Sequence, residues 1–378
     1  MKIAVNTRML LSGKMEGIGR FTYEIFSRMA KNHPEVEFHF FFDRPYDSKF
    51  VFAENVIPHF IGPPARHPYL MRIWYDITWP LLLKKINPDI VISPDAQCSL
   101  TTKFPQIVVI HDINFEHYPK DIPPVYYRDL KKRTPKFCAK AEKIITVSEF
   151  SKKDLMAHYK LGEEKMDVIY NGASEFYSPL NDEEKVKAKK KFAHGEDYFI
   201  YVGSIHPRKN LQRLIPAFLS FKKRTQSPTK LVVVGQTFWK NKELDGIMKE
   251  AVENGDIIFV GRLEGEDLKL AVGGAKASVY VSYFEGFGIP IVEAFSARVP
   301  VITSNVTSMP EVAGNAALLI DPFSVDSISK GLEKIDNDEA LRAQLIDQGS
   351  IELKRFSWEQ SSQKFWRIIE ETIRNAKS

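Results

Sequence analysis

Two glutamates eight positions apart are the residues of this sequence whose spacing first suggests chemistry. Glu285 and Glu293 occur in FEGFGIPIVEA, directly after ASVYVS, a run of residues typical of a buried strand. The glycines between them predict a tight turn, and Pro290 is accommodated in the first turn of a helix. Such a helix start offers free N–H groups to a phosphate, while a carboxylate accepts two hydrogen bonds from neighbouring sugar hydroxyls. The segment therefore predicts a sugar-phosphate site at the end of a strand, rather than a glycine-rich turn with surface glutamates.

A pair of cations follows another predicted strand. Arg208 and Lys209 lie in VGSIHPRKNL, just before an amphipathic helical stretch. An arginine neutralises a departing diphosphate with forked hydrogen bonds, and a lysine does so as a point charge. A basic pair by itself is usually a surface feature. Its place at a strand end, like that of the glutamates, favours a functional interpretation.

Two weaker patterns occur in the first half of the chain. His111 and Asp112 follow the apolar run IVVI, although a solitary histidine is more often structural than catalytic. Gly17 and Gly19 occur in MEGIGRFTYEIF, before a helical stretch. A dinucleotide-binding fingerprint requires a third glycine where Thr22 stands, so a nicotinamide site stays open only as an alternative.

Short apolar runs alternate with helical stretches along the chain, which predicts an α/β fold with parallel sheets covered on both faces. The chain has 378 residues, more than one hydrophobic core usually serves, so we expect two domains. A polar, charged segment near 171–181 marks the boundary. The predicted strands are 2–8, 38–42, 89–93, 107–110, 143–147 and 167–170 in the first series, and 198–202, 231–234, 257–260, 278–281, 299–303 and 317–320 in the second.

The motif FEGFGIPIVEA resembles the E-x7-E motif of the retaining glycosyltransferases of family four, and Gly203, Arg208 and Lys209 match the glycine, arginine and lysine pattern of that family. The resemblance extends over most of the chain. It implies the GT-B fold, in which two Rossmann-like parallel-sheet domains face each other across a cleft. Residues 1–175 are then the acceptor domain, 176–356 the donor domain, and a last helix near 357–378 crosses back to the first domain.

The resemblance also implies roles for individual residues. Glu285 is expected beside the transferred sugar and Glu293 on the ribose of the nucleotide. His111, Asp112, Glu285, Arg208 and Lys209 are the implied catalytic residues. The implied nucleotide-sugar contacts are Gly17, Gly19, Gly203, Arg208, Lys209, Arg262, Leu263, Gly286, Phe287, Gly288, Ile289 and Glu293, with Arg262 and Leu263 near the base.

Within the family, the chain is most similar to bacterial mannosyltransferases that use GDP-mannose in O-antigen or exopolysaccharide assembly. The implied partners are a nucleotide-sugar donor and a saccharide or lipid-linked glycan acceptor. No metal is expected, because Arg208, Lys209 and the helix ends would supply its charge, and the Asp-x-Asp triplet 336–338 falls in a late turn. The alternatives are a sugar-nucleotide epimerase, an NAD(P)-dependent oxidoreductase, and a non-catalytic nucleotide-sugar-binding protein.

The net charge is +5, and no nucleic-acid motif accompanies the basic stretch 128–143, so nucleic acid is not expected as a partner. Only Cys98 and Cys138 are present, which suits a reducing compartment, and the first residues do not form a signal peptide. We therefore expect a cytoplasmic protein. Segment 66–85 has aromatic residues, including Trp74 and Trp79, between basic ends. It predicts peripheral contact with the inner membrane face, or alternatively a core helix.

Overall fold

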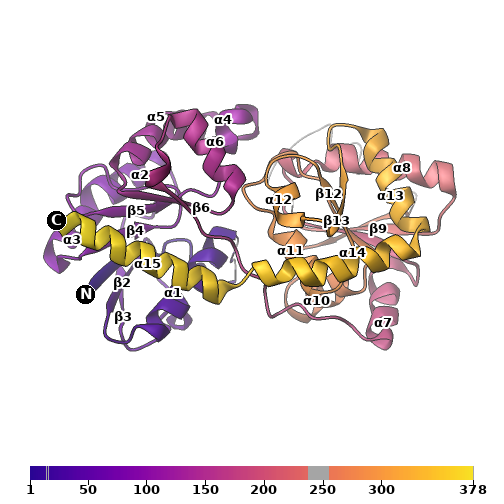
Figure 1. The fold of residues 1–378 in the computed structure, drawn as a ribbon, viewed down its shortest axis with the longest axis horizontal. Helices are drawn as coiled ribbons and strands as arrows, with labels where there is room; N and C mark the ends of the chain where they lie inside the picture. The colour runs from indigo at the N-terminus through magenta and orange to yellow at the C-terminus, as the bar shows by residue number, and fades with distance from the viewer. Residues whose placement is uncertain (14, 16, 237–254, 378) are drawn as a thin grey trace. The chain divides into compact units, whose positions relative to one another are not determined.

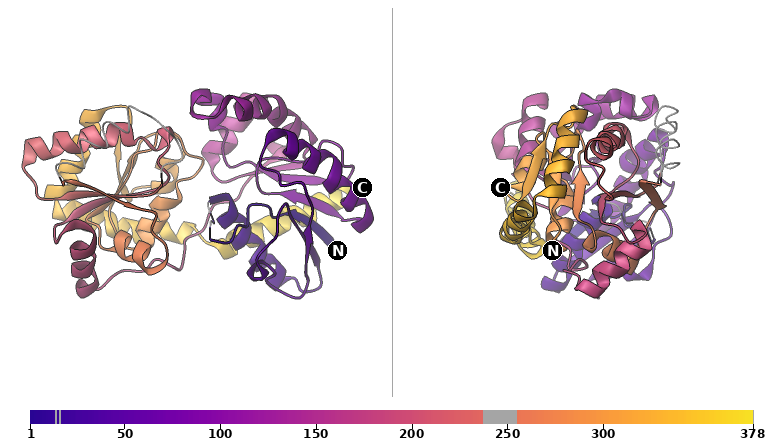
Figure 2. Two further views of the ribbon diagram at one scale, coloured as in Figure 1. Left: turned by 180° about the vertical axis from the view of Figure 1, so that it is seen from behind. Right: turned by 90° about the vertical axis from the view of Figure 1, so that its right-hand side faces the viewer.

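A computed structural model describes residues 1–13, 15, 17–236 and 255–377. The chain forms two compact units (Figure 1). Unit 1 comprises Met1–Gly172 together with Ser357–Ser378, and unit 2 comprises Ala173–Phe356. Each unit contains a parallel sheet between helices, as the views of Figure 2 show, so the predicted α/β fold with two Rossmann-like units is confirmed.

The sheet of unit 1 has the strand order β3-β2-β1-β4-β5-β6-β7, and the neighbouring strands are parallel. The order reverses direction between β1 and β4, and ligands of such sheets bind beyond the carboxyl ends of the strands at this point. The strands are β1 (Lys2–Asn6), β2 (Glu37–Phe42), β3 (Val56–Phe60), β4 (Ile90–Ser93), β5 (Gln106–Val109), β6 (Lys143–Thr146) and β7 (Met166–Val168).

One strand of unit 1 was not predicted. Strand β3 has the sequence VIPHF, and Pro58 at its centre argues against a strand in the interior of a sheet. In the structure β3 pairs with β2 alone and forms the edge of the sheet, where a proline that donates no hydrogen bond is tolerated.

The helices of unit 1 include one from the far end of the chain. They are α1 (Gly17–Asn32), α2 (Pro68–Ile73), the π-helical segment η2 (Trp74–Thr78), α3 (Trp79–Ile86), α4 (Asn114–His117), α5 (Pro124–Lys140), α6 (Glu149–Tyr159) and α15 (Trp358–Lys377). The side chain of Ser357 caps α15 by accepting a hydrogen bond of 3.3 Å from the Gln360 amide. Helix α15 lies along α1 (Figure 1), and the Ser362 hydroxyl donates to the carbonyl of Ile25 at 3.1 Å.

The aromatic residues of segment 66–85 belong to the core of unit 1. Trp74 and Trp79 are fully buried and pack with Tyr75 and Leu83. The indole N–H of Trp74 donates to the carbonyl of Ile61 at 3.0 Å. The two tryptophans themselves therefore cannot touch a membrane in the folded protein.

We expect Trp74→Ala to lower the free energy of unfolding of unit 1 by about 3 to 5 kcal/mol, because it leaves a large cavity and an unpaired carbonyl. The matched change Leu81→Ala, at an exposed position of the following helix, should cost less than about 1 kcal/mol. Urea denaturation followed by tryptophan fluorescence compares the two variants. Equal losses would contradict the packing described.

The sheet of unit 2 has the strand order β10-β9-β8-β11-β12-β13, again with parallel neighbours. Its direction of winding reverses between β8 and β11, so these two strand ends are the expected ligand site. The strands are β8 (Tyr198–Val202), β9 (Lys230–Val234), β10 (Ile257–Gly261), β11 (Ala277–Tyr280), β12 (Val301–Ser304) and β13 (Ala317–Ile320).

Helices cover both faces of this sheet. Because successive side chains of a strand point to opposite faces, Phe199 and Tyr201 of β8 join the core with α8 and α13, while Tyr198 faces the other side. There its hydroxyl donates to the carbonyl of Ala271 in α10 at 2.7 Å. The helices are α7 (Asp182–Ala193), α8 (Leu211–Thr225), α10 (Gly265–Gly273), α11 (Ile289–Ser296), α12 (Met309–Ala313), α13 (Val325–Asn337) and α14 (Glu339–Glu352).

Candidate functional site

Both predicted cations of unit 2 bind the same carboxylate. Arg208 and Lys209 lie in a 3₁₀ turn after β8, and Glu285 lies in the loop after β11. The Arg208 Nη1 atom is 2.5 Å from Glu285 Oε2, and the Lys209 Nζ atom is 2.6 Å from Glu285 Oε1. The ends of β8 and β11 are adjacent at the point where the sheet reverses its winding. This explains how Glu285 meets two cations that precede it by 76 and 77 positions in the sequence.

The ionised state of Glu285 is fixed by its surroundings. The residue is 5% exposed, and Lys209 is 8% exposed. Burial alone would raise the pKa of Glu285, but the charges of Arg208 and Lys209 lower that pKa to about 2. A general acid or base works best with a pKa near the operating pH. In this state Glu285 therefore acts through its negative charge and its hydrogen bonds rather than by exchanging a proton.

The lowered pKa of Glu285 has a consequence for stability at acid pH. The unfolded carboxyl titrates near 4.5 and the folded one near 2, so its contribution to the free energy of unfolding is complete above pH of about 4.5. This contribution, on the order of 3 kcal/mol, is lost as the pH falls toward 2. Urea unfolding at several pH values should show a smaller loss on acidification for Glu285→Gln than for the wild type. An exposed control, Glu264→Gln, should behave like the wild type.

The loop that carries Glu285 is held by hydroxyl groups from the segment after β12. The Ser308 hydroxyl lies 2.9 Å from the carbonyl oxygens of both Glu285 and Phe287. The Glu285 amide donates to Thr307 Oγ1 at 3.3 Å. Gly288 ends the loop with φ +105°, a conformation that side chains rarely adopt, and α11 begins at the next residue, Ile289.

Thr307 and Ser308 could not be predicted as site residues, because the sequence of their own segment does not indicate contact with a loop more than twenty positions earlier. Tyr280, at the end of β11, was not predicted either, because a tyrosine in a strand is usually a core residue. Lys209 Nζ donates to the Tyr280 hydroxyl at 2.5 Å and lies 4.8 Å from the centre of its ring. Burial raises the pKa of Tyr280, so this hydroxyl stays neutral.

The other predicted residues of unit 2 lie around this cluster or farther along the sheet. Glu293 is half-buried in α11, about one turn from its start, and Gly286 and Phe287 are buried in the loop. Gly203 follows β8 directly, and a side chain on the neighbouring Gly235 would come within 1.9 Å of the Gly203 carbonyl oxygen. The backbone at Gly235, just after β9, therefore lies in close contact with the backbone at the end of β8.

Arg262 and Leu263 follow β10, the edge strand of the sheet. Arg262 is exposed, and its Nε atom lies 2.7 Å from Oε1 of Glu264. Leu263 is half-buried. Strand β9 lies between β10 and β8, so these two residues stand apart from the cluster at Glu285. Their role at the base is a prediction.

His111 and Asp112 follow β5 in unit 1, and both are half-buried. His111 Nε2 lies 2.9 Å from the carbonyl oxygen of Pro94, and a carbonyl can only accept, so Nε2 carries a hydrogen. Burial lowers the pKa of His111, which leaves the ring neutral with its lone pair on Nδ1. Asp112 accepts a hydrogen bond of 3.0 Å from the Asn114 amide.

The predicted glycines of unit 1 lie at the start of α1. Gly17 is its first residue, and Gly19 is buried where a side chain would come within 2.5 Å of the Met9 carbonyl oxygen. Phe21, one half-turn further, packs edge-on against the ring of His111 at 5.3 Å between centroids. The structure thus brings the start of α1 and His111 together within unit 1.

A buried polar network marks the point where the unit 1 sheet reverses its winding. The carboxylate of Asp95 binds the guanidinium of Arg8 and accepts from the Tyr75 hydroxyl at 2.6 Å and from Asn6 at 2.9 Å. Arg8 also donates to the carbonyl of Ala65 at 2.7 Å. Although burial opposes its charge, Asp95 raises the pKa of Arg8 above its usual value. This network could not be predicted from the sequence, because its members are far apart along the chain.

Comparison with known proteins decides the family. The model named "Glycosyl transferases group 1" matches residues 182–351, and "Glycosyltransferase Family 4" matches residues 15–174. The O-antigen chain mannosyltransferase B of Escherichia coli is 32% identical over 258 residues, which are 67% of this chain and 67% of that protein. The chain belongs to the group 1, family 4 glycosyltransferases.

Two further likenesses agree with this assignment. The O-antigen chain mannosyltransferase RfbU of Salmonella typhimurium is 28% identical to this chain over 298 residues, which are 77% of this chain and 78% of that protein. The structure of sucrose-phosphate synthase from Thermosynechococcus elongatus superposes with a TM-score of 0.79 and 16% identity over 100% of each chain. The family resemblance and the two Rossmann-like parallel-sheet units that it implied are therefore confirmed.

The nicotinamide alternative finds no support in the first βαβ segment of the glycosyltransferase. Thr22 occupies the position of the third glycine, and its hydroxyl donates to the carbonyl of Ile18 inside α1 at 2.8 Å. Asp43, the acidic residue near the end of β2, is fully buried. Its carboxylate accepts from the Ala65 amide at 2.8 Å and from Arg44 at 2.6 Å, so it serves the fold and not a ribose.

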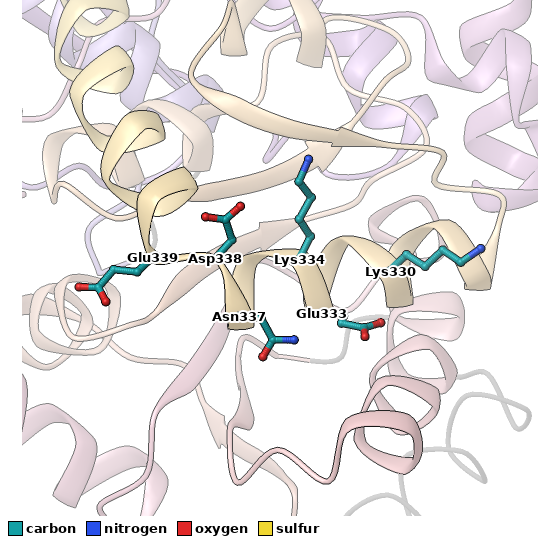
Figure 3. A pocket seen from close by; sticks show the side chains of 6 residues that line it. All are labelled: Lys330, Glu333, Lys334, Asn337, Asp338 and Glu339. Carbon is teal, nitrogen blue, oxygen red and sulfur yellow. The ribbon is translucent and has the colours of Figure 1, made fainter.

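The Asp-x-Asp triplet of the glycosyltransferase joins two helices. Asp336 binds Lys276 at 2.7 Å and the hydroxyls of Ser227 and Thr229 at 2.8 Å, and Asp338 caps α14. Figure 3 shows this junction of α13 and α14, where charged side chains line an open hollow that contains none of the predicted site residues. The triplet therefore has a structural function. Within the described part of the chain, no three His, Cys, Asp or Glu side chains are grouped to hold a metal ion.

Proposed function

We propose that this glycosyltransferase is a retaining enzyme that moves mannose from GDP-mannose onto a saccharide or a lipid-linked glycan. The proposal depends on one observation above all: Arg208 and Lys209 converge, at hydrogen-bond distance, on a buried carboxylate at the point of unit 2 where ligands of such sheets bind. Two cations held in place at one strand end suit a ligand with two phosphates.

The reaction breaks the bond between the anomeric carbon of the sugar and the diphosphate, and negative charge develops on the leaving oxygen. Arg208 and Lys209 stabilise this charge, and because Glu285 already orients both, little reorganisation is needed when the bond breaks. Stabilisation that grows in the transition state raises turnover rather than affinity alone.

Retention follows from attack by the acceptor on the same face that the diphosphate leaves. A covalent glycosyl intermediate would need a carboxylate with a lone pair directed at the sugar. Each oxygen of Glu285 binds a cation, and its low pKa makes it a poor nucleophile. This favours direct attack through an oxocarbenium-like transition state. His111, with a lone pair on Nδ1, is proposed to accept a hydrogen bond from a hydroxyl of the transferred sugar, and Asp112 to orient that sugar or the acceptor.

We also propose that transfer needs no metal ion, because Arg208 and Lys209 supply the positive charge that a divalent cation would bring to the diphosphate. Excess EDTA should leave the initial rate within about twofold of the untreated enzyme. A large loss of activity that Mg²⁺ or Mn²⁺ restores would contradict this part of the proposal.

The donor sugar is proposed from the relatives, two of which are named as O-antigen chain mannosyltransferases. A glycan acceptor in polysaccharide assembly has the same support. Glu293 is proposed to bind the ribose, the glycine loop after β11 the diphosphate, and Arg262 with Leu263 the guanine.

A panel of nucleotide sugars tests the donor and the reaction together. Mass spectrometry of the reaction products should show hydrolysis or transfer from GDP-mannose in preference to UDP-glucose and UDP-N-acetylhexosamines. Proton NMR of the product should show an α-linked mannose, the configuration of the donor. Preference for a UDP-sugar or a β-linked product would contradict the proposal. An altered nucleotide sugar with no transfer would indicate an epimerase, and binding without turnover a non-catalytic protein.

A further inference from the structure

Four large apolar side chains are exposed in a row along the continuous helix formed by α2, η2 and α3. Tyr69, Ile73, Ile77 and Leu81 are 39 to 65% exposed, and each is four positions from the next. The opposite side of the same helix is buried through Trp74 and its neighbours. Segment 66–85 thus has two apolar sides, of which the core covers only one.

The π-helical segment in the middle explains why the row stays straight. Four residues of α-helix advance by 400°, so an apolar row at this spacing drifts around the helix by 40° per step. The π-helical segment η2 has more residues in each turn, so the helix rotates by a smaller angle per residue and part of this drift is offset. The row therefore remains on one side of the helix from Tyr69 to Leu81, and Lys84 and Lys85 follow at its end.

Positive charge is concentrated beside this row. Segment 66–85 and α5 together contain ten Lys and Arg and two Asp, an excess of eight, whereas the whole chain has a net charge of +5. The rest of the chain is therefore net negative. Helix α5 lies next to α2 (Figure 1), and the two carboxylates are taken up between them: Asp129 binds Arg72 at 2.5 Å and Asp76 binds Arg133 at 2.6 Å.

Three cations of α5 are directed outward, whereas Lys131 of the same helix pairs with Glu116. Arg128, Lys132 and Lys136 are exposed on the side of α5 away from its buried residues.

The apolar row itself has exposed cations at both ends, Arg66 before it and Lys84 with Lys85 after it. This is the pattern of a surface that lies on anionic lipid, because the apolar side chains enter the boundary of the acyl chains while the cations meet the headgroups. A protein partner would not require such an excess of one charge.

We propose that Tyr69, Ile73, Ile77 and Leu81, with the exposed cations of α5, form a face of unit 1 that docks on an anionic phospholipid bilayer. Docking does not depend on the identity of the donor. It deepens the proposed function by favouring, between the two kinds of acceptor, a glycan carried on a membrane lipid. Among the described residues, none of the helices combines the length and the apolar composition of a membrane-spanning segment.

The apolar part of this face is tested by sedimentation of the full chain with vesicles of phosphatidylglycerol and phosphatidylcholine. The triple variant Ile73→Ser, Ile77→Ser, Leu81→Ser should bind about tenfold more weakly, or worse, because three apolar side chains no longer enter the bilayer. The control Leu319→Ser, Val186→Ser, Ile351→Ser changes side chains of unit 2 that are 39 to 56% exposed, a similar exposure, and should bind like the wild type. Equal weakening by both triples would overturn the proposal.

The charged part is tested by Lys132→Glu with Lys136→Glu, against Lys187→Glu with Lys190→Glu on α7 of unit 2 as a control of equal charge change. The first pair should weaken binding to anionic vesicles at least about tenfold at low salt, and the control pair by much less. Wild-type binding should also fall as salt rises. Equal binding to vesicles of phosphatidylcholine alone would contradict the charge argument.

Light scattering during size-exclusion chromatography supplies a further outcome. A change in oligomeric mass in the variant Ile73→Ser, Ile77→Ser, Leu81→Ser, with no loss of vesicle binding, would mean that a second copy of the chain covers the row. Donor hydrolysis without vesicles should be unchanged in all these variants. A folded wild type that binds vesicles but hydrolyses no donor would refute the proposed function and leave the docking face intact.

Discussion

Replacing Lys209 with methionine is expected to slow sugar transfer on the order of 10² to 10³-fold, with a smaller change in KM for the donor. Methionine keeps the length and apolar stem of the side chain but removes the charge. In the structure Lys209 Nζ is fixed between the Glu285 carboxylate and the Tyr280 hydroxyl, so the charge stands ready when the diphosphate departs. Steady-state kinetics with the preferred donor, measured as kcat and KM separately, test this expectation.

The control for Lys209→Met is Lys276→Met. Lys276 is also shielded from solvent and bound to a mostly buried carboxylate, that of Asp336, at 2.7 Å. Removing either lysine leaves a carboxylate without that partner, so both variants should lose stability. Only Lys209→Met should lose turnover. If the two variants lost turnover equally, the effect would be one of folding, and Lys209 would have no special part in the reaction.

Glu285→Gln is expected to lower turnover at least a hundredfold and, at the same time, to tighten binding of GDP about tenfold. The amide keeps the shape of the side chain but no longer neutralises Arg208 and Lys209. In the ligand-free protein these cations bind the carboxylate, and a diphosphate must compete with it. Without this competitor the product binds more tightly, while the cations lose the group that orients them for the transition state.

Isothermal titration calorimetry with GDP and single-turnover kinetics separate the two effects of Glu285→Gln. Glu333→Gln is the control, because Glu333 pairs with Arg224, neither of which is a predicted nucleotide contact, and it should alter neither quantity by more than about threefold. Weaker binding of GDP to Glu285→Gln would show that Glu285 supports the nucleotide instead of competing with it. Tighter binding together with normal turnover would remove Glu285 from the reaction.

Much of the fold could be predicted from the sequence because buried parallel strands are short apolar runs. All the predicted strands are present, within about two residues at each end, and the predicted α/β fold is correct. Strand β3 could not be predicted, since a proline is compatible with a strand only at a sheet edge and the sequence does not mark edges. Trp74 and Trp79 lie in the core, whereas Tyr69, Ile73, Ile77 and Leu81 of the same segment are exposed, and composition alone does not distinguish the two sets.

The candidate site was only partly predictable for a similar reason. Arg208, Lys209 and Glu285 each follow a strand directly, and the carboxyl ends of parallel strands meet at one edge, so their convergence follows from the sheet. The groups that hold these three residues in place come from segments that are distant in the sequence. The Tyr280 hydroxyl meets Lys209 only when β8 and β11 are paired, and the Ser308 hydroxyl meets the loop of Glu285 only when β11 and β12 are paired. The network of Arg8 with Asp95 depends in the same way on the pairing of β1 with β4.

The place of α15 imposes an order on biosynthesis. Phe21 and Phe26 of α1 are covered by Phe365, whose segment the ribosome makes only after the whole of unit 2. At about 5 to 20 residues per second, translation of the intervening residues takes many seconds, and unit 2 is completed first. The nascent chain therefore carries an uncovered apolar surface on its earliest part throughout this delay, which makes the newly made protein a natural client of ribosome-associated chaperones.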